Sequence, residues 1–284
     1  MKTSKQNNAP GKRKVIVMIE LDELQQYIYS VFTEFDRICK KHGLKYSMEG
    51  GTLMGAVKFR GFVPWDDDID VVMLRDDYET FLKIAPTELD DQYFLQSFNN
   101  IPQFPLNYAK LCYNGTMICD YAYSHIKKMN HGVFMDIFPL DNVVPKKLSL
   151  HCSLVGVLTG ARVTKLKMKA TDNRLKKVVY KLLSFLPMRL LIKMINKVCT
   201  HYNTKETGYI YEVCNSNRKF QPMKSEMYHE YTQLKFRDAD FMAVKEYDSF
   251  LKSRFGEHYA EEMPPDEERI CSHHETVVFT NQKE

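Results

Sequence analysis

The sequence predicts an α/β (α+β) fold: a mixed sheet with flanking helices, joined by a basic helical segment. Short β-branched runs alternate with apolar residues at helical spacing, in the order helix, strand, helix, strand, helix, hairpin, strand. That order favours a mixed sheet over a doubly wound parallel one. The chain has 284 residues, 44% of them hydrophobic, which is enough to enclose a substantial core.

The first elements follow from apolar spacing and from glycine. Apolar residues recur every three or four positions from Glu20 to His42, which predicts a helix that ends at Gly43. LKYSME (44–49) is a short strand candidate. A second helix is expected over 52–59, directly after two glycines.

The following elements alternate in the same way. DDIDVVM (67–73) is a strand with one buried face, and RDDYETFLKIAP (75–86) is a helix that stops before its proline. Asn-Gly at 114–115 lies between two aromatic and β-branched runs, which predicts a hairpin. HGVFMDIFPL (131–140) is a further strand with one acid inside it.

Four aspartates lie close together in PWDDDIDVVM. In a strand, alternate side chains share a face, so Asp66, Asp68 and Asp70 are expected on one side and Asp67 on the other. Neighbouring carboxylates stay ionised when a cation lies between them, and this donor set suits Mg²⁺ or Mn²⁺. One alternative is a solvated acidic loop that caps the next helix. A calcium loop is disfavoured because Val71 stands where that loop needs glycine.

A glycine-rich turn precedes these aspartates. Gly50 and Gly51, followed by Thr52 at a strand-to-helix turn, offer backbone N–H groups and a hydroxyl to a phosphate. A phosphate-binding turn facing a carboxylate metal site is the arrangement that phosphoryl or nucleotidyl transfer needs.

These motifs resemble the LicD family, which includes bacterial phosphocholine transferases, fukutin and fukutin-related protein. The resemblance rests on YSMEGGTLMGAVKFRGFVPWDDDIDVVM, and then on NYAKLCYNGT, HGVFMDIFPLD and a C-terminal run that ends in SHH. It implies a nucleotidyltransferase-like fold, similar to that of DNA polymerase β. In that fold, two aspartates of a D-x-D motif and a third from a neighbouring strand bind metal ions.

Carried onto this sequence, the resemblance makes Asp68 and Asp70 the D-x-D metal ligands, with Asp66 completing the set or lying just outside it. The third strand carboxylate is Asp136, as a metal ligand or as a general base. Asp141 is its rival, although a cap or turn role after the preceding proline is favoured for Asp141.

Further residues are weaker candidates. Lys58, Arg60, Lys110 and His131 would stabilise phosphate charge, and Trp65 would stack on a base or a choline group, although each also fits a surface or core role. The family commonly has arginine where Lys58 stands, and lysine lacks the bidentate fork. His273 and His274 are interpreted as pocket or packing residues, since neither has a partner at metal-ligand spacing.

Positive charge is concentrated in the middle of the chain. Residues 146–200 contain thirteen Lys or Arg and the single acid Asp172, a charge of +12 against +4 for the whole chain. The expected parts are a disordered tail (1–14), a nucleotidyltransferase-like catalytic core (15–145), the basic helical segment (146–200) and a C-terminal part completing the catalytic domain (201–284). Seven cysteines without a CxxC pair, and no secretory or membrane-spanning run, favour the cytoplasm.

The predicted activity is metal-dependent transfer of a phosphorylated alcohol, with phosphocholine favoured, from a CDP-activated donor to a hydroxyl of a cell-surface glycan or teichoic acid precursor. This donor and this acceptor come from the resemblance. The alternatives are transfer of a nucleoside monophosphate to a small molecule or RNA, and a non-catalytic glycan-binding protein. Nucleic acid is not an expected partner. The basic segment is expected to contact an anionic inner membrane face through residues 162–197.

Overall fold

The structure is a computed structural model that describes residues 14–118, 123–216, 220–261 and 276–281, and for 14–18 and 276–281 it describes the backbone alone. The helices of these residues are α1 (Leu21–His42), α2 (Gly50–Phe59), α3 (Arg75–Glu88), α4 (Leu148–Lys165), α5 (Arg174–Leu183), α6 (Met188–Cys199) and α7 (Tyr247–Phe255). The strands are β1 (Lys14–Met18), β2 (Ser47–Met48), β3 (Asp70–Leu74), β4 (Tyr93–Gln96), β5 (Ala109–Tyr113), β6 (Thr116–Ile118), β7 (Phe134–Asn142), β8 (Tyr209–Tyr211), β9 (Met223–Lys224), β10 (Tyr231–Phe236), β11 (Ala239–Val244) and β12 (Thr276–Asn281).

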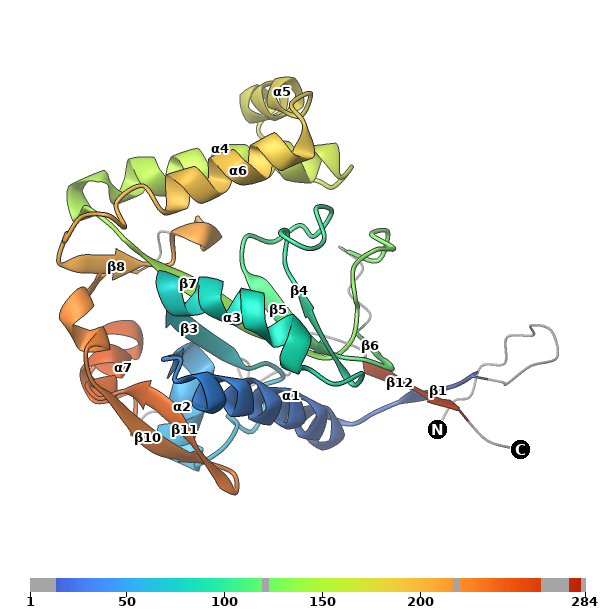
Figure 1. Cartoon of the computed structure of the whole chain (residues 1–284), viewed down its shortest axis with the longest axis vertical. Coiled ribbons are helices and arrows are strands. Elements are labelled where there is room, and N and C mark those ends of the chain that lie inside the picture. The colour runs from blue at the N-terminus through green and yellow to red at the C-terminus, as the bar shows by residue number, and fades with distance from the viewer. Residues whose placement is uncertain (1–13, 119–122, 217–219, 262–275, 282–284) are drawn as a thin grey trace.

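A mixed sheet forms the centre of the molecule (Figure 1). Its strands follow the order β2-β3-β7-β5-β4, and β8 and β9 extend it from the end of β7. Within this sheet β3 and β7 run parallel, whereas the other described pairs are antiparallel. The predicted α/β class with a mixed sheet and flanking helices is therefore confirmed.

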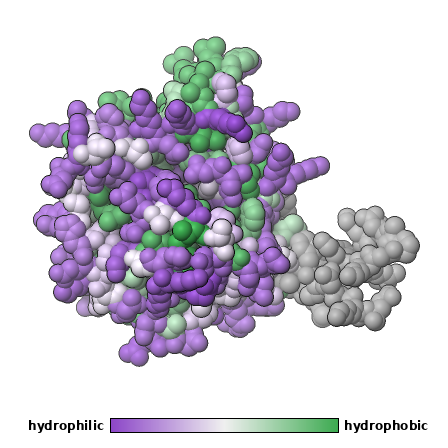
Figure 2. All heavy atoms as spheres, viewed as in Figure 1, coloured by the Kyte–Doolittle hydropathy of each residue, from purple (hydrophilic) through white to green (hydrophobic). Residues whose placement is uncertain are grey.

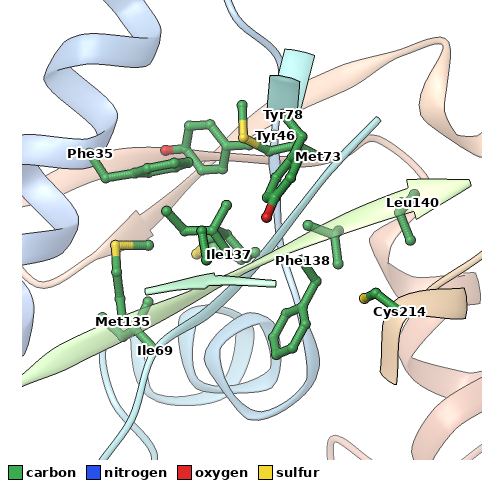
Figure 3. Packing of buried hydrophobic residues seen from close by; sticks show 14 of the residues in the cluster. Phe35, Tyr46, Ile69, Met73, Tyr78, Met135, Ile137, Phe138, Leu140 and Cys214 are labelled. Atoms are coloured by element: carbon green, nitrogen blue, oxygen red, sulfur yellow. The ribbon is translucent and has the colours of Figure 1, made fainter. Parts of the chain in front are cut away.

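Helices α1 and α3 pack on one face of this sheet (Figure 1). The apolar stripe of α1, which includes the fully buried Phe35, faces alternate residues of β7 such as Met135 and Ile137. Figure 3 shows Phe138 on the opposite side of β7 from Ile137, as strand alternation requires. Gly43 ends α1 in the left-handed conformation, with φ of 67°, as its position predicts.

Smaller units surround this centre. The β10–β11 hairpin and α7 pack around α2, and β1, β12 and β6 form a three-stranded sheet. Helices α4, α5 and α6 stack together along one edge of the molecule, at the top of Figure 1. Among the described residues, no helix combines the length and the apolar character that crossing a membrane requires. The division into four parts stays a prediction, and residues 1–13 of the expected tail lie outside the described part.

Several local predictions are wrong. β3 begins only at Asp70, so the first three aspartates precede the strand. The Asn-Gly turn at 114–115 does link β5 to β6, but among the described residues β6 pairs with β12, and β5 pairs with β4 and β7. Helix α3 continues through Pro86 to Glu88, because Pro86 lies in the last turn.

The basic segment is helical, as predicted, but one of its cations is internal. Arg162 of α4 is fully buried, and its Nη2 donates to the carbonyls of Phe104 and Leu106, each at 2.8 Å. Burial lowers the pKa of Arg162 to about 10. Arg162 therefore joins α4 to the 98–106 loop and is not part of a basic surface, while the membrane contact expected of the basic segment stays a prediction.

Candidate active site

Three of the predicted side chains lie in one row across the sheet. Asp70 of β3 is in register with Asp136 of β7, and Asp136 with Lys110 of β5. Residues in register on adjacent strands project from the same face. Because Asp136 alternates with Ile137, this row lies on the face of the sheet opposite α1 (Figure 3).

Lys110 and Asp136 form a buried ion pair, with 2.7 Å between Lys110 Nζ and Asp136 Oδ1. Lys110 is only 5% exposed, and its Nζ lies 3.1 Å from the centre of the Phe134 ring. Burial raises the pKa of Asp136, while the charge of Lys110 and hydrogen bonds from Lys110 and Tyr108 oppose that rise. Lys110 therefore favours the ionised form of Asp136 in a site that would otherwise favour the neutral acid.

Asp66, Asp67 and Asp68 form a second acidic group in the loop just before β3. Each offers an oxygen, and these oxygens all lie within 4.8 Å of one another. The expectation that Asp67 faces away from its neighbours is wrong, because these residues are in a loop rather than a strand. Asp67 is the buried member of the three, and Asp66 and Asp68 are half-buried.

The first turn of α2 lies against these acids. A Cβ placed on Gly51 would stand 2.7 Å from Asp66 Oδ2, so the Asp66 carboxylate reaches the start of the helix. The Thr52 hydroxyl accepts the Asp70 N–H at 2.9 Å, and the Glu49 N–H donates to the Asp70 carbonyl at 3.0 Å. Gly50 has a left-handed φ of 51°. The α2 N-terminus, whose free N–H groups favour anions, is thus fixed beside the first residue of β3.

Two acids and an arginine extend this site beyond what we predicted. Arg254 Nη2 of α7 lies 3.6 Å from Glu49 Oε1, and both side chains are largely buried. Burial raises the pKa of Glu49, with Glu212 adding to the rise and Arg254 opposing it. Burial also raises the pKa of Asp70, as do, in decreasing order, the charges of Asp68, Asp136 and Glu212. Glu212 is a single acid in the apolar run YIYEVC, the same signal that singled out Asp136.

The weaker candidates are placed less centrally. Lys58 Nζ donates to the Tyr259 carbonyl at 3.5 Å, and Arg60 is the exposed residue that ends α2, with φ of 54°. Trp65 is half-buried, with its ring edge-on to Phe59 at 6.3 Å.

His131 and Asp141 are also placed apart from the row. His131 Nε2 lies 3.2 Å from the Ile126 carbonyl, in the loop before β7. Asp141 lies in β7, so the cap or turn role expected for it is wrong. Its carboxylate instead accepts two hydrogen bonds from Arg75 and one from Asn203. His273 and His274 lie outside the described residues.

The donor set fits a hard divalent cation. Asp66, Asp67 and Asp68 supply carboxylate oxygens close enough to share one ion, and the half-buried Asp70 follows two residues after Asp68. Burial, and then repulsion by neighbouring acids, raises the pKa values of Asp66 and Asp70, and a bound cation would offset both effects. The structure thus groups Asp66, Asp67 and Asp68 as residues that could hold Mg²⁺ or Mn²⁺, and the family resemblance adds Asp70 and Asp136 on the adjacent strands.

The titration of Asp66 gives a testable pH dependence. Burial, together with the charges of Asp68 and Asp67, raises the pKa of Asp66 to about 7 from an ordinary value of 3.8. Between these values the folded state holds a proton that the unfolded state has lost, so Asp66 makes the protein less stable as pH rises through this window. Without divalent cations, the Asp66→Asn variant should therefore gain melting temperature over the parent at pH about 8 but not at pH about 4.

Thermal melts in chelator at both pH values test this expectation. Saturating Mg²⁺ should raise the melting temperature of the parent at the higher pH, since the cation replaces the proton. An equal difference between parent and variant at the two pH values would contradict the assigned shift.

Gly51 gives a second test. Alanine is normally favourable inside a helix by about 0.5–1 kcal/mol, but here its Cβ would push the Asp66 carboxylate from its position. We expect Gly51→Ala to keep or increase stability while weakening Mn²⁺ binding several-fold, as measured by calorimetry. Gly50→Ala is the matched control: its left-handed φ predicts a loss of about 1–2 kcal/mol in stability without a direct effect on Asp66.

Carboxylates from a loop and two adjacent strands, beside a glycine-rich helix start, define the class of site expected in metal-dependent phosphate-transferring proteins. Residues 43–149 match the family described as LicD/FKTN/FKRP, nucleotidyltransferase domain. All of the acids that we predicted as ligands lie within this range. The resemblance to the LicD family that the motifs indicated is therefore confirmed.

Individual relatives agree with this family match. The chain is 27% identical over 263 residues to the lipopolysaccharide cholinephosphotransferase LicD of Haemophilus influenzae, covering 90% of this chain and 96% of that protein. Over 59 residues it is 36% identical to an uncharacterised protein of Rickettsia typhi, covering 21% of this chain and 19% of that protein. A similar protein of Rickettsia prowazekii is 34% identical over 59 residues, covering 21% and 22%.

Proposed function

We propose that this protein transfers phosphocholine from a CDP-activated donor to a hydroxyl of a cell-surface glycan such as lipopolysaccharide. The observation that carries the proposal is the row of Asp70, Asp136 and Lys110, set beside the start of α2 and the Asp66–Asp68 loop. The similarity to a lipopolysaccharide cholinephosphotransferase over almost the whole of both chains supports the choice of alcohol and acceptor. A teichoic acid precursor is the alternative acceptor.

In this proposal, Asp68 and Asp70 would hold Mg²⁺ or Mn²⁺, and a bound cation would neutralise the pyrophosphate of the donor. The Asp66 carboxylate would complete the ligand set, or orient water around it. The free N–H groups at Gly50 and Gly51 would receive donor phosphate oxygens at the positive end of α2. The hydroxyl of Thr52 already accepts the Asp70 N–H, so its role toward phosphate would be as a donor.

Asp136 and Lys110 would act on the acceptor side. The acceptor oxygen forms a bond to the β-phosphorus, the bond between that phosphorus and the bridging oxygen breaks, and CMP leaves. The hydroxyl proton passes to a carboxylate. Asp136 is suited to take it, because Lys110 favours its ionised form at 2.7 Å despite burial. Asp136 as a direct metal ligand is the alternative role.

Side chains around the acidic site would contact the cytosine and choline ends of the donor. Trp65 is half-buried beside Phe59 and would stack on the cytosine or on the choline cation. Lys58 and Arg60 at the end of α2 would add positive charge to the same side. We propose the cytoplasm as the protein's location, because seven cysteines without a CxxC pair suit a reducing compartment.

The experiment is incubation of the purified protein with Mg²⁺ and separate CDP-choline, CDP-ethanolamine, CDP-glycerol and CDP-ribitol, with and without lipopolysaccharide or teichoic acid precursors. We expect acceptor-dependent CMP release, greatest with CDP-choline, and loss of the signal with chelator. Pyrophosphate release from a nucleoside triphosphate, with a nucleoside monophosphate joined to the acceptor, would instead establish nucleotidyl transfer and overturn the proposal.

A further inference from the structure

Helix α5 turns an apolar stripe toward solvent. Leu175, Val178, Val179 and Leu182 follow the spacing of one helical face, and their exposed fractions are 80%, 59%, 44% and 65%. Phe185, just after the helix, is 78% exposed. Figure 2 shows apolar atoms gathered at the apex where Figure 1 places α5. A surface helix normally buries such a stripe against its own core, so this face needs a covering surface.

The other side of α5 fixes this orientation. Tyr180 is buried against α4, and a Cβ placed on Gly160 would stand 2.5 Å from its ring. Lys165 Nζ of α4 also donates to the Ser184 carbonyl at 2.9 Å, just past the end of α5. Because the contacting side already packs on α4, α5 cannot bury its apolar stripe by rolling about its axis without breaking these contacts.

Cations surround the stripe. Arg174, Lys176, Lys177 and Lys181 are exposed on α5 itself. The single acid of the basic segment, Asp172, pairs with Lys169 at 3.0 Å. Further exposed cations lie on the neighbouring elements, namely Lys165, Lys167, Arg189, Lys193 and Lys197.

We infer that α5 docks this protein on an anionic lipid bilayer, with Leu175, Val178, Val179 and Leu182 entering the headgroup region and the cations contacting lipid phosphates. A second copy of the chain is disfavoured as the partner. A two-fold interface would bring the same patch of both copies together and place one basic rim against the other. This inference concerns location and does not depend on which alcohol the active site transfers.

The test is co-sedimentation of the full chain with vesicles of phosphatidylglycerol and phosphatidylcholine, compared with pure phosphatidylcholine, at low and high salt. The parent should bind anionic vesicles, and high salt should weaken but not abolish the binding, since apolar insertion is insensitive to screening. The variant Leu175→Gln, Leu182→Gln should bind roughly tenfold or more weakly. Its melting temperature should match the parent, because both side chains are exposed.

The matched control is Phe94→Gln, Phe255→Gln, which removes two exposed apolar side chains from β4 and α7. It should bind vesicles as the parent does. Three results would overturn the inference: no binding of the parent to anionic vesicles, equal loss in the control, or a dimer of the parent in solution that the Leu175, Leu182 variant abolishes.

Discussion

Replacing Asp70 by asparagine is expected to lower the transfer rate about a thousandfold or more, without lowering stability. Asp70 is the first residue of β3, in register with Asp136, and its backbone is held by Thr52 and Glu49. Those backbone contacts remain in the variant. The carboxylate charge, which the proposed metal site requires, is removed.

The free energy of unfolding should be unchanged or higher, because ionising Asp70 at this position destabilises the folded state. Its pKa is raised by burial and then by the charges of Asp68, Asp136 and Glu212, so ionised Asp70 destabilises the folded state until a cation arrives. The neutral amide has no such repulsion. Urea unfolding in chelator measures this directly, and Asp240→Asn, at an exposed position in β11, is the matched control.

Asp70→Asn should also remove most of the stabilisation that Mg²⁺ gives to the parent. A variant that kept its activity, or that lost activity only because it unfolded, would argue against a metal-binding role for Asp70.

Replacing Asp141 by asparagine is expected to do the reverse, destabilising the protein by about 3–5 kcal/mol. Asp141 is fully buried in β7, and Arg75 donates to both of its oxygens at 2.8 and 2.6 Å. Asn203 donates to the same carboxylate at 2.7 Å. The amide removes the negative charge, so Arg75 stays buried without a counter-charge. Its N–H₂ group also faces the N–H donors of Arg75 or Asn203.

Urea unfolding at neutral pH measures this loss. A double variant, Arg75→Met with Asp141→Leu, should recover most of it, because replacing both charges leaves neither unpaired. A loss below about 1 kcal/mol in Asp141→Asn would show that the pair contributes no more than a surface ion pair.

The contrast between Asp136 and Asp141 shows what sequence can and cannot predict. Both are acids inside the apolar run of β7, and such an acid must be paired, metal-bound or protonated. The pattern shows that each is special but not which partner it has. Lys110 and Arg75 reach them from β5 and α3, and that depends on strand register and helix packing rather than on local spacing.

The fold itself was largely predictable, because α1, α2 and the strands β3 and β7 have strong periodic signals and clear glycine punctuation. The aspartate run was not. Alternation assumes that a strand is already paired, yet the chain turns at Pro64 and Trp65, with the Asp66 N–H bonded to the Val63 carbonyl. Pairing starts only at Asp70, so Asp67 lies among its neighbours instead of opposite them.

Glu212 could have been found and was not. It stands alone in an apolar run, as Asp136 does, but it lies beyond the basic segment and far along the chain from the aspartate loop. Its influence on Asp70 appears only when β8 pairs with the end of β7 and brings this part of the chain back to the sheet.

In the proposed reaction, the carboxylates around Asp68 and Asp70 hold a divalent cation against the donor phosphates. Crystals grown with Mn²⁺ and CDP-choline, measured at the manganese absorption edge, test it most directly. We predict an anomalous peak within coordination distance of Asp68 and Asp70, with the donor pyrophosphate between that peak and Gly51. CDP-choline bound elsewhere, or bound here with no metal peak beside these aspartates, would contradict it.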